Sequence, residues 1–299
     1  MTVVDIEGRQ LKLSNLDKVL YPSTGFTKGQ VIDYYSRVAP ALLAHLSGRP
    51  LTLKRYPDGV DGNFFYEKRC PKHRPEWMQT LSVWSSRNKG EVPYCLVDEL
   101  ASVVWVANMA SLELHTSLSR DPIERPTAVV FDLDPGPGTG IPECARLALR
   151  LRDILDDLGL RLWVKTSGSK GLQPYLPLNT EVEYEGSAGT KTFARLLAEL
   201  LEKESPKEVT SKMAKALRPG KVFVDWSQND QHKTTVCVYS MRARERPTVS
   251  TPVSWEEVEA AAEGNDPLVF ETDDVLARIE RDGDLFAEVE TVKQALPAL

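Results

Sequence analysis

Hydrophobic residues recur at helical spacing in several stretches of this 299-residue chain. In TKGQVIDYYSRVAPALLAHL, Thr27 is a suitable N-cap and the apolar positions predict a helix over residues 28–46. IPECARLALRLRDILDDLG predicts an amphipathic helix that ends at Gly159, and residues 190–203 predict another. Residues 98–115 are rich in apolar residues and are predicted to form a buried helix.

Short apolar runs between these helices predict strands. The segments RPLTLKRYP and NFFYEK flank the turn PDGVDG. TAVVFDLDPGPG is a β-branched strand that breaks on Pro and Gly just after two aspartates, and RLWVKTSGSKG runs into a Gly/Ser/Lys turn. KVFVDWSQND and KTTVCVYSMR predict two strands separated by a turn. Because strands and helices mix without strict βαβ alternation, we predict an α+β fold in a single catalytic domain over residues 1–299, with room for two lobes.

The charge is unevenly distributed along the chain. The formal net charge is -6, which argues at first against a nucleic-acid partner. However, residues 251–299 carry 13 acidic against 3 basic residues, whereas residues 204–250 carry 5 acidic against 9 basic residues. The acid excess therefore lies largely in the last part of the chain, and the remainder can present basic patches to a phosphate backbone.

The cysteines are scattered and contain no C-x-x-C pair: Cys70, Cys95, Cys144 and Cys237. The sequence thus suggests neither a zinc ribbon nor a disulfide framework, and we expect a reducing, cytoplasmic setting. The chain has no apolar run of about 18 residues, and its first residues lack the apolar stretch of a signal peptide. We therefore expect no membrane association.

Three aspartates are the strongest chemical signal. Asp132 and Asp134 lie two apart at the end of a predicted strand, so their side chains point to the same face, and such a pair is unfavourable unless a cation neutralises it. Asp225 is the only charge inside the apolar run VFVDW, where an unpaired carboxylate is costly. Together they predict a cage for two Mg²⁺ or Mn²⁺ ions, and the lack of a His/Cys cluster argues against zinc. The alternatives are solvated turn acids for the pair, and an ion pair from Asp225 to Lys221 or Lys233.

Other residues are weaker candidates. The turn at residues 166–171 supplies glycines, hydroxyls and Lys170, which suit a triphosphate, although such turns are more often ordinary loops. His115, expected after the buried helix, is equally compatible with a structural role. Arg242, expected at the end of the strand that follows Asp225, is a candidate phosphate clamp. The aromatic run Phe64, Phe65 and Tyr66 suits base stacking, or else the core.

In order along the chain, these segments resemble the polymerase domain of bacterial DNA ligase D and its stand-alone relatives, members of the archaeo-eukaryotic primase superfamily. The resemblance is carried by LSNLDKVLYPSTGFTKGQVIDYY, GRPLTLKRYPDGVDGNFFYEK, VVFDLDPG, VKTSGSKGL, AKALRPGKVFVDWSQND, YSMRARERPTVSTPVSW and RIERDGDLF. It implies a primase-like catalytic domain with two mixed β-sheets and flanking helices. It also implies a template-directed polymerase that adds nucleotides, with ribonucleotides favoured, to primer 3′-hydroxyl ends in gap-filling repair or non-homologous end joining.

The resemblance also implies residue roles. The catalytic metal ions, two Mn²⁺ or Mg²⁺, are assigned to Asp132, Asp134 and Asp225. The incoming nucleotide and the template are assigned to Lys54, Phe65, Tyr66, His115, Ser167, Lys170, Gln228 and Arg242. A downstream 5′-phosphate on gapped or primed DNA is assigned to Asn15, Lys18 and Lys28. The implied partners are this DNA, NTP or dNTP, a DNA ligase and an end-binding protein such as Ku, in the nucleoid of a bacterial cytoplasm.

One departure from the family pattern lies just after the Ser/Lys turn. Gln173 stands where the motif after the Ser/Lys turn usually has a histidine, and glutamine hydrogen-bonds but carries no charge, so the resemblance implies altered triphosphate affinity or pH dependence. Two alternatives to a polymerase remain. A haloacid dehalogenase-type phosphatase is suggested by DLD and the later Thr166 and Ser167, although VFVDWSQND lacks its paired acidic motif. A non-catalytic DNA-binding module is disfavoured, because clustered carboxylates would not help such a module to bind the negatively charged DNA.

Overall fold

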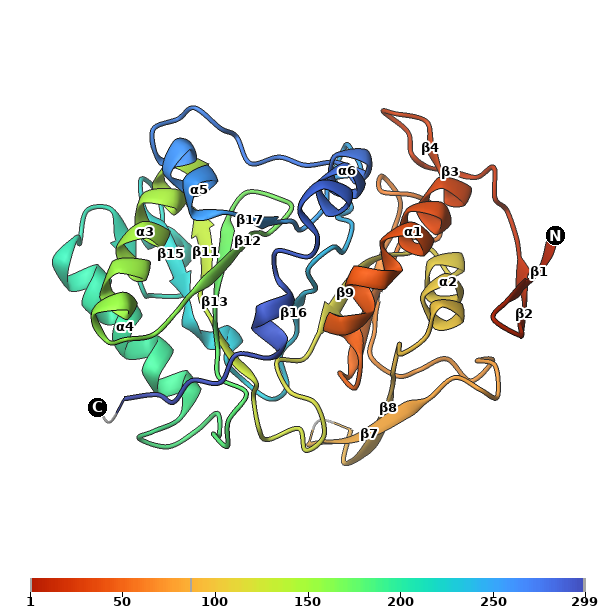
Figure 1. Ribbon diagram of the computed structural model, residues 1–299, viewed down its shortest axis with the longest axis horizontal. Coiled ribbons are helices and arrows are strands. Elements are labelled where there is room, and N and C mark those ends of the chain that lie inside the picture. The colour runs from red at the N-terminus through yellow and green to blue at the C-terminus, as the bar shows by residue number, and fades with distance from the viewer. Residues whose placement is uncertain (1, 87, 298–299) are drawn as a thin grey trace. The chain divides into compact units, whose positions relative to one another are not determined.

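The chain forms two compact units, each assembled from three segments of the sequence. In this computed structural model, which describes residues 2–86 and 88–297, unit 1 comprises Met1–Ser117, Thr234–Ser250 and Phe270–Asp284. Unit 2 comprises Leu118–Lys233, Thr251–Val269 and Leu285–Leu299. The chain therefore enters each unit three times, as the colours of Figure 1 allow the reader to follow.

A six-stranded antiparallel sheet is the centre of unit 1. Its order is β16–β9–β5–β8–β7, and β6 pairs with β5. The bounds are β5 Leu51–Arg55, β6 Phe65–Glu67, β7 Thr80–Ser85, β8 Gly90–Cys95, β9 Ser111–Thr116 and β16 Thr235–Val236. The predicted strands on either side of PDGVDG are β5 and β6, so that prediction is confirmed. Two small hairpins complete the strands of this unit: β1 Thr2–Ile6 with β2 Arg9–Leu13, and β3 Val19–Tyr21 with β4 Phe26–Thr27.

The helices of unit 1 are α1 Lys28–Leu46, α2 Leu100–Asn108 and α6 Thr272–Asp282, and α1 packs against the other two. Helix α1 has the predicted bounds, because Thr27 and Gln30 form a capping box at its start. The prediction of one helix over residues 98–115 is wrong. The chain turns at Ala110, which has a φ of +57°, and continues as strand β9. His115 therefore lies within a strand rather than after a helix.

A seven-stranded mixed sheet is the centre of unit 2. Its order is β14–β15–β11–β13–β12–β17, and β10 pairs with β13. Only β14 and β15 are parallel among the pairs of the described residues. The bounds are β10 Ala128–Val130, β11 Asp132–Pro135, β12 Trp163–Thr166, β13 Leu172–Pro177, β14 Val209–Thr210, β15 Val222–Asp225 and β17 Pro252–Val253.

Three helices pack within unit 2: α3 Ile141–Asp157, α4 Thr190–Glu204 and α5 Trp255–Ala262 (Figure 1). Helix α3 contacts β11, β13, β15 and α5, and α4 contacts β10 and β14. Gly159, with a φ of +71°, follows α3 as predicted, because glycine adopts this conformation without a steric penalty. Short 3₁₀ turns occupy Lys215–Leu217 (η1), Trp226–Gln228 (η2) and Ala287–Glu290 (η3).

The apolar stripe of α3 explains how the carboxylate-bearing strand is held. Leu151 and Leu155 are fully buried on this helix, and burial of a leucine side chain contributes about 2 kcal/mol. On β11, Leu133 is fully buried, whereas its neighbours Asp132 and Asp134 are half-buried. The alternation of a strand thus anchors β11 through one face and leaves its aspartates on the other.

The predicted strand KTTVCVYSMR is mostly irregular. Only Thr235–Val236 forms a strand, β16, and it pairs with β9 of unit 1 rather than with β15. Arg242 therefore lies beyond the strand, next to Met241, which forms an isolated bridge with Val249. Its backbone amide donates to the Thr248 carbonyl, so a turn and not a strand end places this side chain.

Cys70 and Cys95 form a disulfide, which corrects the prediction that the cysteines provide no such link. Cys95 ends β8, and the Cys70 amide donates to the Pro93 carbonyl on the same strand, so the two Cα atoms lie 4.9 Å apart. The sheet creates this proximity, whereas a spacing of 25 residues carries no motif. Cys144 and Cys237 are buried and take no part in this disulfide.

Among residues 2–86 and 88–297, no helix combines the length and hydrophobicity that a membrane span requires.

Candidate active site

Three aspartates project from one face of the unit 2 sheet. Asp132 and Asp134 lie on β11, and Asp225 ends the neighbouring antiparallel strand β15. Asp132 stands directly opposite Asp225 in the register of these strands. Because directly opposite residues share a face, and so do residues two apart, the pairing brings all three carboxylates to the same face.

The charges at this face fit a bound cation. Burial, and then the Asp134 carboxylate, raise the pKa of Asp132 to about 7, and Asp225 acts in the same direction. The hydrogen bond from Gln173 and the charge of Lys165 act in the opposite direction. A divalent cation would relieve the repulsion between the carboxylates, and carboxylate oxygens are ligands that Mg²⁺ and Mn²⁺ prefer.

The Asp225 carboxylate is engaged in local hydrogen bonds. It accepts from the amide and hydroxyl of Ser227, at 3.0 and 2.5 Å, and from Gln228 Nε2 at 2.7 Å. Lys221 donates to a backbone carbonyl and Lys233 to the Ser227 hydroxyl, so the two lysines considered as its partners bond elsewhere. No three His, Cys, Asp or Glu side chains of the described chain are already arranged around a metal position. A cation shared with the β11 pair would therefore bind a carboxylate that also accepts hydrogen bonds from Ser227 and Gln228.

The Ser/Lys turn lies against β11. Ser167 Oγ accepts from the amides of Ser169 and Gly171, at 3.3 and 3.1 Å, so this hydroxyl closes the turn. A Cβ on Gly171 would lie 2.0 Å from the Leu133 carbonyl oxygen, and only glycine therefore permits the close approach to β11. Lys170 is exposed in this turn. The structure thus brings the Ser/Lys turn beside the strand that carries the paired aspartates.

Gln173 contacts Asp132. Its Nε2 donates to Asp132 Oδ1 at 3.0 Å, and its Oε1 accepts from Lys165 Nζ. Lys165 and Gln173 stand directly opposite each other on β12 and β13. The residue that departs from the family pattern is therefore bonded to a candidate metal ligand.

A second polar cluster lies in unit 1 around Glu113, whose exposed fraction is 2%. Lys54 on β5 stands directly opposite Glu113 on β9, and its Nζ lies 3.3 Å from Oε1. His115 Nε2 and Arg242 Nε lie 2.9 and 3.4 Å from Oε2, and the Ala243 amide donates to Oε1 at 3.2 Å. Three of the candidate nucleotide-binding side chains thus converge on one buried carboxylate.

These neighbours set the ionisation of the cluster. Burial acts to raise the pKa of Glu113, but the hydrogen bond with His115 and the charges of Arg242 and Lys54 hold that pKa well below its ordinary value. Burial lowers the pKa of His115, against the opposing effect of Glu113. Glu113 is therefore ionised at neutral pH, and His115 is mostly neutral.

Sequence reasoning missed Glu113. The predicted helix over residues 98–115 obscured the period-two pattern of SLELHT, which is a strand in the structure. Read as a strand, that string places Glu113 and His115 on one face, and this alternation is the signal that could have revealed the cluster.

The aromatic run beside this cluster is exposed, so the alternative of a core position is wrong. Phe64, Phe65 and Tyr66 are 51%, 44% and 58% exposed. Lys54 Nζ lies 4.5 Å from the centre of the Phe64 ring and 5.5 Å from that of Tyr66. Exposed rings beside cationic groups are suited to stack with a base.

The three residues assigned to a 5′-phosphate lie together at the start of α1. The Lys18 amide donates to the Asn15 carbonyl, and the Lys28 amide donates to the Lys18 carbonyl. Lys18 pairs with Asp58 at 2.8 Å, and buried Lys28 donates to a backbone carbonyl at 2.7 Å. Burial, and then the charges of Lys18 and Arg55, lower the pKa of Lys28.

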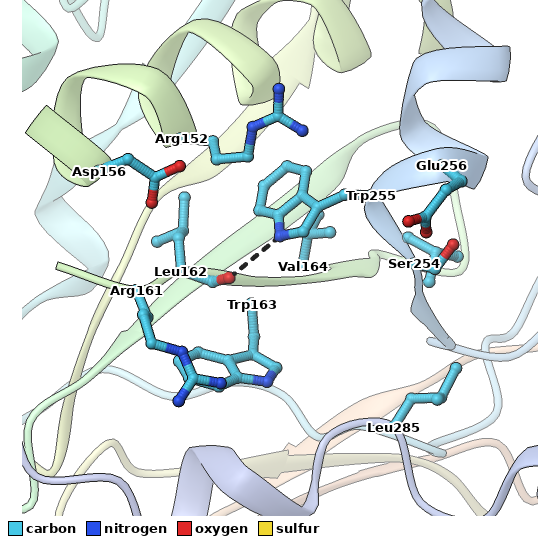
Figure 2. Close-up of a pocket in the computed structure, with 11 residues that line it drawn as sticks. Arg152, Asp156, Arg161, Leu162, Trp163, Val164, Ser254, Trp255, Glu256 and Leu285 are labelled. Atoms are coloured by element: carbon cyan, nitrogen blue, oxygen red, sulfur yellow. Dashed lines mark hydrogen bonds between the residues drawn. The ribbon is translucent and has the colours of Figure 1, made fainter.

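Unit 2 also contains a cleft of about 400 Å³ lined by two arginine–tryptophan pairs (Figure 2). The Arg161 guanidinium lies 4.6 Å from the centre of the Trp163 ring, and that of Arg152 lies 5.2 Å from Trp255. Trp255 Nε1 donates to the Leu162 carbonyl, as the dashed line in Figure 2 marks. Neither the aspartates nor the Ser/Lys turn lines this cleft, and both arginines are paired with glutamates. We therefore assign it no part in the candidate site.

Comparisons with known proteins agree with one another. Residues 27–286 match the family described as LigD, primase-polymerase domain. The chain is 42% identical over 293 residues to the multifunctional non-homologous end joining DNA repair protein LigD of Mycobacterium tuberculosis, covering 94% of this chain and 37% of that protein. It is 30% identical over 275 residues to the bifunctional non-homologous end joining protein LigD of Bacillus subtilis, covering 92% and 43%.

A solved structure is similar over almost the whole chain. The polymerase domain from M. tuberculosis ligase D, in complex with DNA, matches with a TM-score of 0.86 and 41% sequence identity. The match covers 95% of this chain and 99% of that one. The chain thus spans less than half the length of the curated relatives, yet nearly all of this solved domain.

Proposed function

Because the chain belongs to the LigD primase-polymerase domain family, a family of nucleotidyltransferases, we propose that it extends primer 3′-hydroxyl ends under the direction of a template strand. Residues 1–299 would act as one catalytic domain in gap-filling repair or non-homologous end joining. The observation that supports this proposal most directly is the register of β11 and β15, which places Asp132 opposite Asp225 and Asp134 on the same face. Family membership removes the phosphatase and the non-catalytic module as alternatives.

In the proposed reaction the primer 3′-hydroxyl attacks the α-phosphate of the incoming nucleotide and pyrophosphate leaves. Asp132, Asp134 and Asp225 would hold two divalent cations, Mn²⁺ or Mg²⁺, which neutralise charge on the reacting phosphates when bound. The donor set fits them, because these half-buried carboxylates repel one another and offer hard oxygen ligands. Holding the reactants in line is the remaining contribution of the protein.

The other candidates would bind the nucleotide and template. Exposed Lys170 can form a charge-assisted contact with the triphosphate, and Ser167 shapes its turn. In unit 1, Arg242 would donate to phosphate oxygens, and His115 would contact the triphosphate. Lys54, Phe65 and Tyr66 would contact the base and the template, and Gln228 would lie near the nucleotide. A preference for ribonucleotides belongs to this proposal.

The proposed DNA substrate is a gap whose downstream strand ends in a 5′-phosphate. Asn15, Lys18 and Lys28 would bind that phosphate, which carries more charge than an internal phosphodiester. The first amides of α1 already donate within the protein, so these side chains would supply the donors. In end joining, a DNA ligase and an end-binding protein such as Ku would be partners, in the nucleoid of a bacterial cell.

A primer-extension assay tests the proposal. The chain is incubated with a primed template, Mn²⁺ and labelled nucleotides offered singly, as NTP or dNTP. We expect addition of the nucleotide that complements the template, and loss of addition in Asp134→Ala but not in Asp157→Ala, an exposed aspartate at the end of α3. Failure of the unmodified chain to extend any primer, or addition that ignores the template, would refute the proposed function.

A further inference from the structure

A buried lysine–glutamine pair is hydrogen-bonded to Asp132 and has no role in the function proposed above. Lys165 is 1% exposed and Gln173 is 4% exposed. The two stand directly opposite each other on β12 and β13, so their side chains share a face. A lysine this deeply buried is unfavourable unless its charge is compensated.

The hydrogen-bonding polarity of the three groups determines how they connect. A lysine ammonium only donates, and an ionised carboxylate only accepts. Gln173 does both, since its Oε1 accepts from Lys165 and its Nε2 donates to Asp132 Oδ1 at 3.0 Å. Reversing the amide would set its NH₂ group against the ammonium and its carbonyl against the carboxylate, so these partners determine its orientation.

This connection ties a candidate metal ligand to the interior of the sheet. Asp132 Oδ1 is held by Gln173, and Gln173 is held in turn by Lys165, whose Nζ also lies 5.5 Å from the centre of the Tyr175 ring. These contacts favour one orientation of the Asp132 carboxylate, against the repulsion of Asp134 and Asp225. Partners that orient a ligand in this way commonly change metal affinity when they are removed.

We propose that Gln173, held by Lys165, is a positioning residue that orients the Asp132 carboxylate for cation binding. This inference rests on the metal site of the proposed function. It differs from a triphosphate contact, because it concerns the apo protein and needs no nucleotide. Neutral histidine also pairs an acceptor with a donor, so Gln173→His would preserve the polarity of the connection.

The test is Mn²⁺ binding by electron paramagnetic resonance, without DNA or nucleotide. Gln173→Leu removes both hydrogen bonds with little change in volume, and Gln173→Asn keeps the amide but shortens its reach. We expect Mn²⁺ affinity to fall about 10- to 100-fold in both. Gln173→His should remain within a few-fold of the unmodified chain, and the control Gln79→Leu, at an exposed position in unit 1, should leave affinity unchanged.

Extension kinetics separate this role from a triphosphate contact. If Gln173 positions Asp132, the leucine variant should need more Mn²⁺, while the nucleotide KM at saturating Mn²⁺ stays close to that of the unmodified chain. Unchanged Mn²⁺ affinity in the folded leucine or asparagine variant, with a raised nucleotide KM, would overturn the inference and leave the proposed function standing. Absence of Mn²⁺ binding by the unmodified chain would instead overturn the proposed metal site and this inference with it. Urea unfolding of each variant establishes that it is folded.

Discussion

Glu113→Gln removes one charge from the buried cluster of unit 1 and keeps the shape of the side chain. The carboxylate lies 3.3 Å from Lys54 Nζ and 3.4 Å from Arg242 Nε. Both cationic side chains are only 14% exposed, so neither regains full hydration when the carboxylate is lost. We therefore expect this substitution to lower the stability of the fold markedly.

The magnitude follows from the cost of leaving buried charges without a counter-charge. Removing one partner of a buried ion pair costs about 3 to 5 kcal/mol. We expect a destabilisation at the lower end of this range, about 3 kcal/mol, for two reasons. Lys54 and Arg242 keep some contact with solvent, and aromatic rings beside the lysine partly stabilise its charge. A domain with an unfolding free energy of about 5 to 15 kcal/mol would remain folded, so the variant can be measured.

The stabilisation that Glu113 contributes should decrease as the pH falls. The pKa of Glu113 is held well below its ordinary value of 4.5, so its contribution is fully present above that pH. As the pH falls below 4.5, the unfolded chain binds the proton first, and the contribution declines by about 1.4 kcal/mol per pH unit until the folded pKa is reached. The stability difference between the unmodified chain and Glu113→Gln should therefore be largest near neutral pH and shrink in acid.

Urea unfolding followed by circular dichroism measures this difference at pH 7.5 and at several values down to pH 3.5. Glu91→Gln, an exposed glutamate on β8, is the matched control and should change the unfolding free energy by less than about 0.5 kcal/mol. Equal stability of Glu113→Gln and the unmodified chain at pH 7.5 would refute the reasoning. A difference independent of pH would show that packing, and not charge, is responsible.

Three further predictions concern the proposed reaction. Asp225→Ala should abolish primer extension but leave DNA binding, measured by fluorescence anisotropy, nearly intact, because it removes a metal ligand and no phosphate contact; substantial extension would mean that the third ligand is misplaced. Lys170→Ala and Arg242→Ala should each raise the nucleotide KM by the equivalent of about 1.5 to 3 kcal/mol, and unchanged KM values in both would remove these residues from the triphosphate site. A gap with a downstream 5′-phosphate should bind more tightly than one with a 5′-hydroxyl, and this preference should disappear in a Lys18→Ala, Lys28→Met double variant. In that variant, the slope of the logarithm of the binding constant against the logarithm of the salt concentration should decrease in magnitude by at most about 2. Equal binding of the two gaps by the unmodified chain would exclude a 5′-phosphate pocket.

Local signals predicted much of the fold because they act within a few residues. Thr27 caps α1 at the predicted position, since its hydroxyl needs only the Gln30 amide one turn away. The helix over residues 98–115 failed for a related reason. The helix is broken at Ala110, which adopts a positive φ that is uncommon for alanine. The sequence NMAS therefore contains no residue that predicts the break. Pairing of β9 with β5, some 60 residues away in the chain, outweighs local helix preference there.

The residues of the candidate site also differ in how far they could be predicted from local sequence. Sequence shows where a charge is costly: a pair of aspartates two apart, or a single aspartate in an apolar strand, is visible without a structure. The partner that offsets the cost is not visible when it comes from another strand. Glu113 meets Lys54 across 59 residues, and Gln173 meets Asp132 across 41. The aspartates were therefore found from sequence, whereas Glu113 and Lys165 needed the sheet register.

The same reasoning explains why a glutamine can stand at position 173. On sequence alone, replacing the usual histidine removes a charge that a triphosphate could use. In the sheet, the position faces an ammonium on one side and a carboxylate on the other. What such a position requires is one acceptor and one donor, and glutamine supplies them at every pH, whereas histidine loses its acceptor on protonation. Glutamine in place of histidine thus preserves the donor and the acceptor at this position. We therefore expect Mn²⁺ affinity to fall less between pH 8 and pH 6 in the unmodified chain than in Gln173→His. Equal impairment of the two from pH 8 to pH 6 would show that polarity at this position is not what the metal site requires.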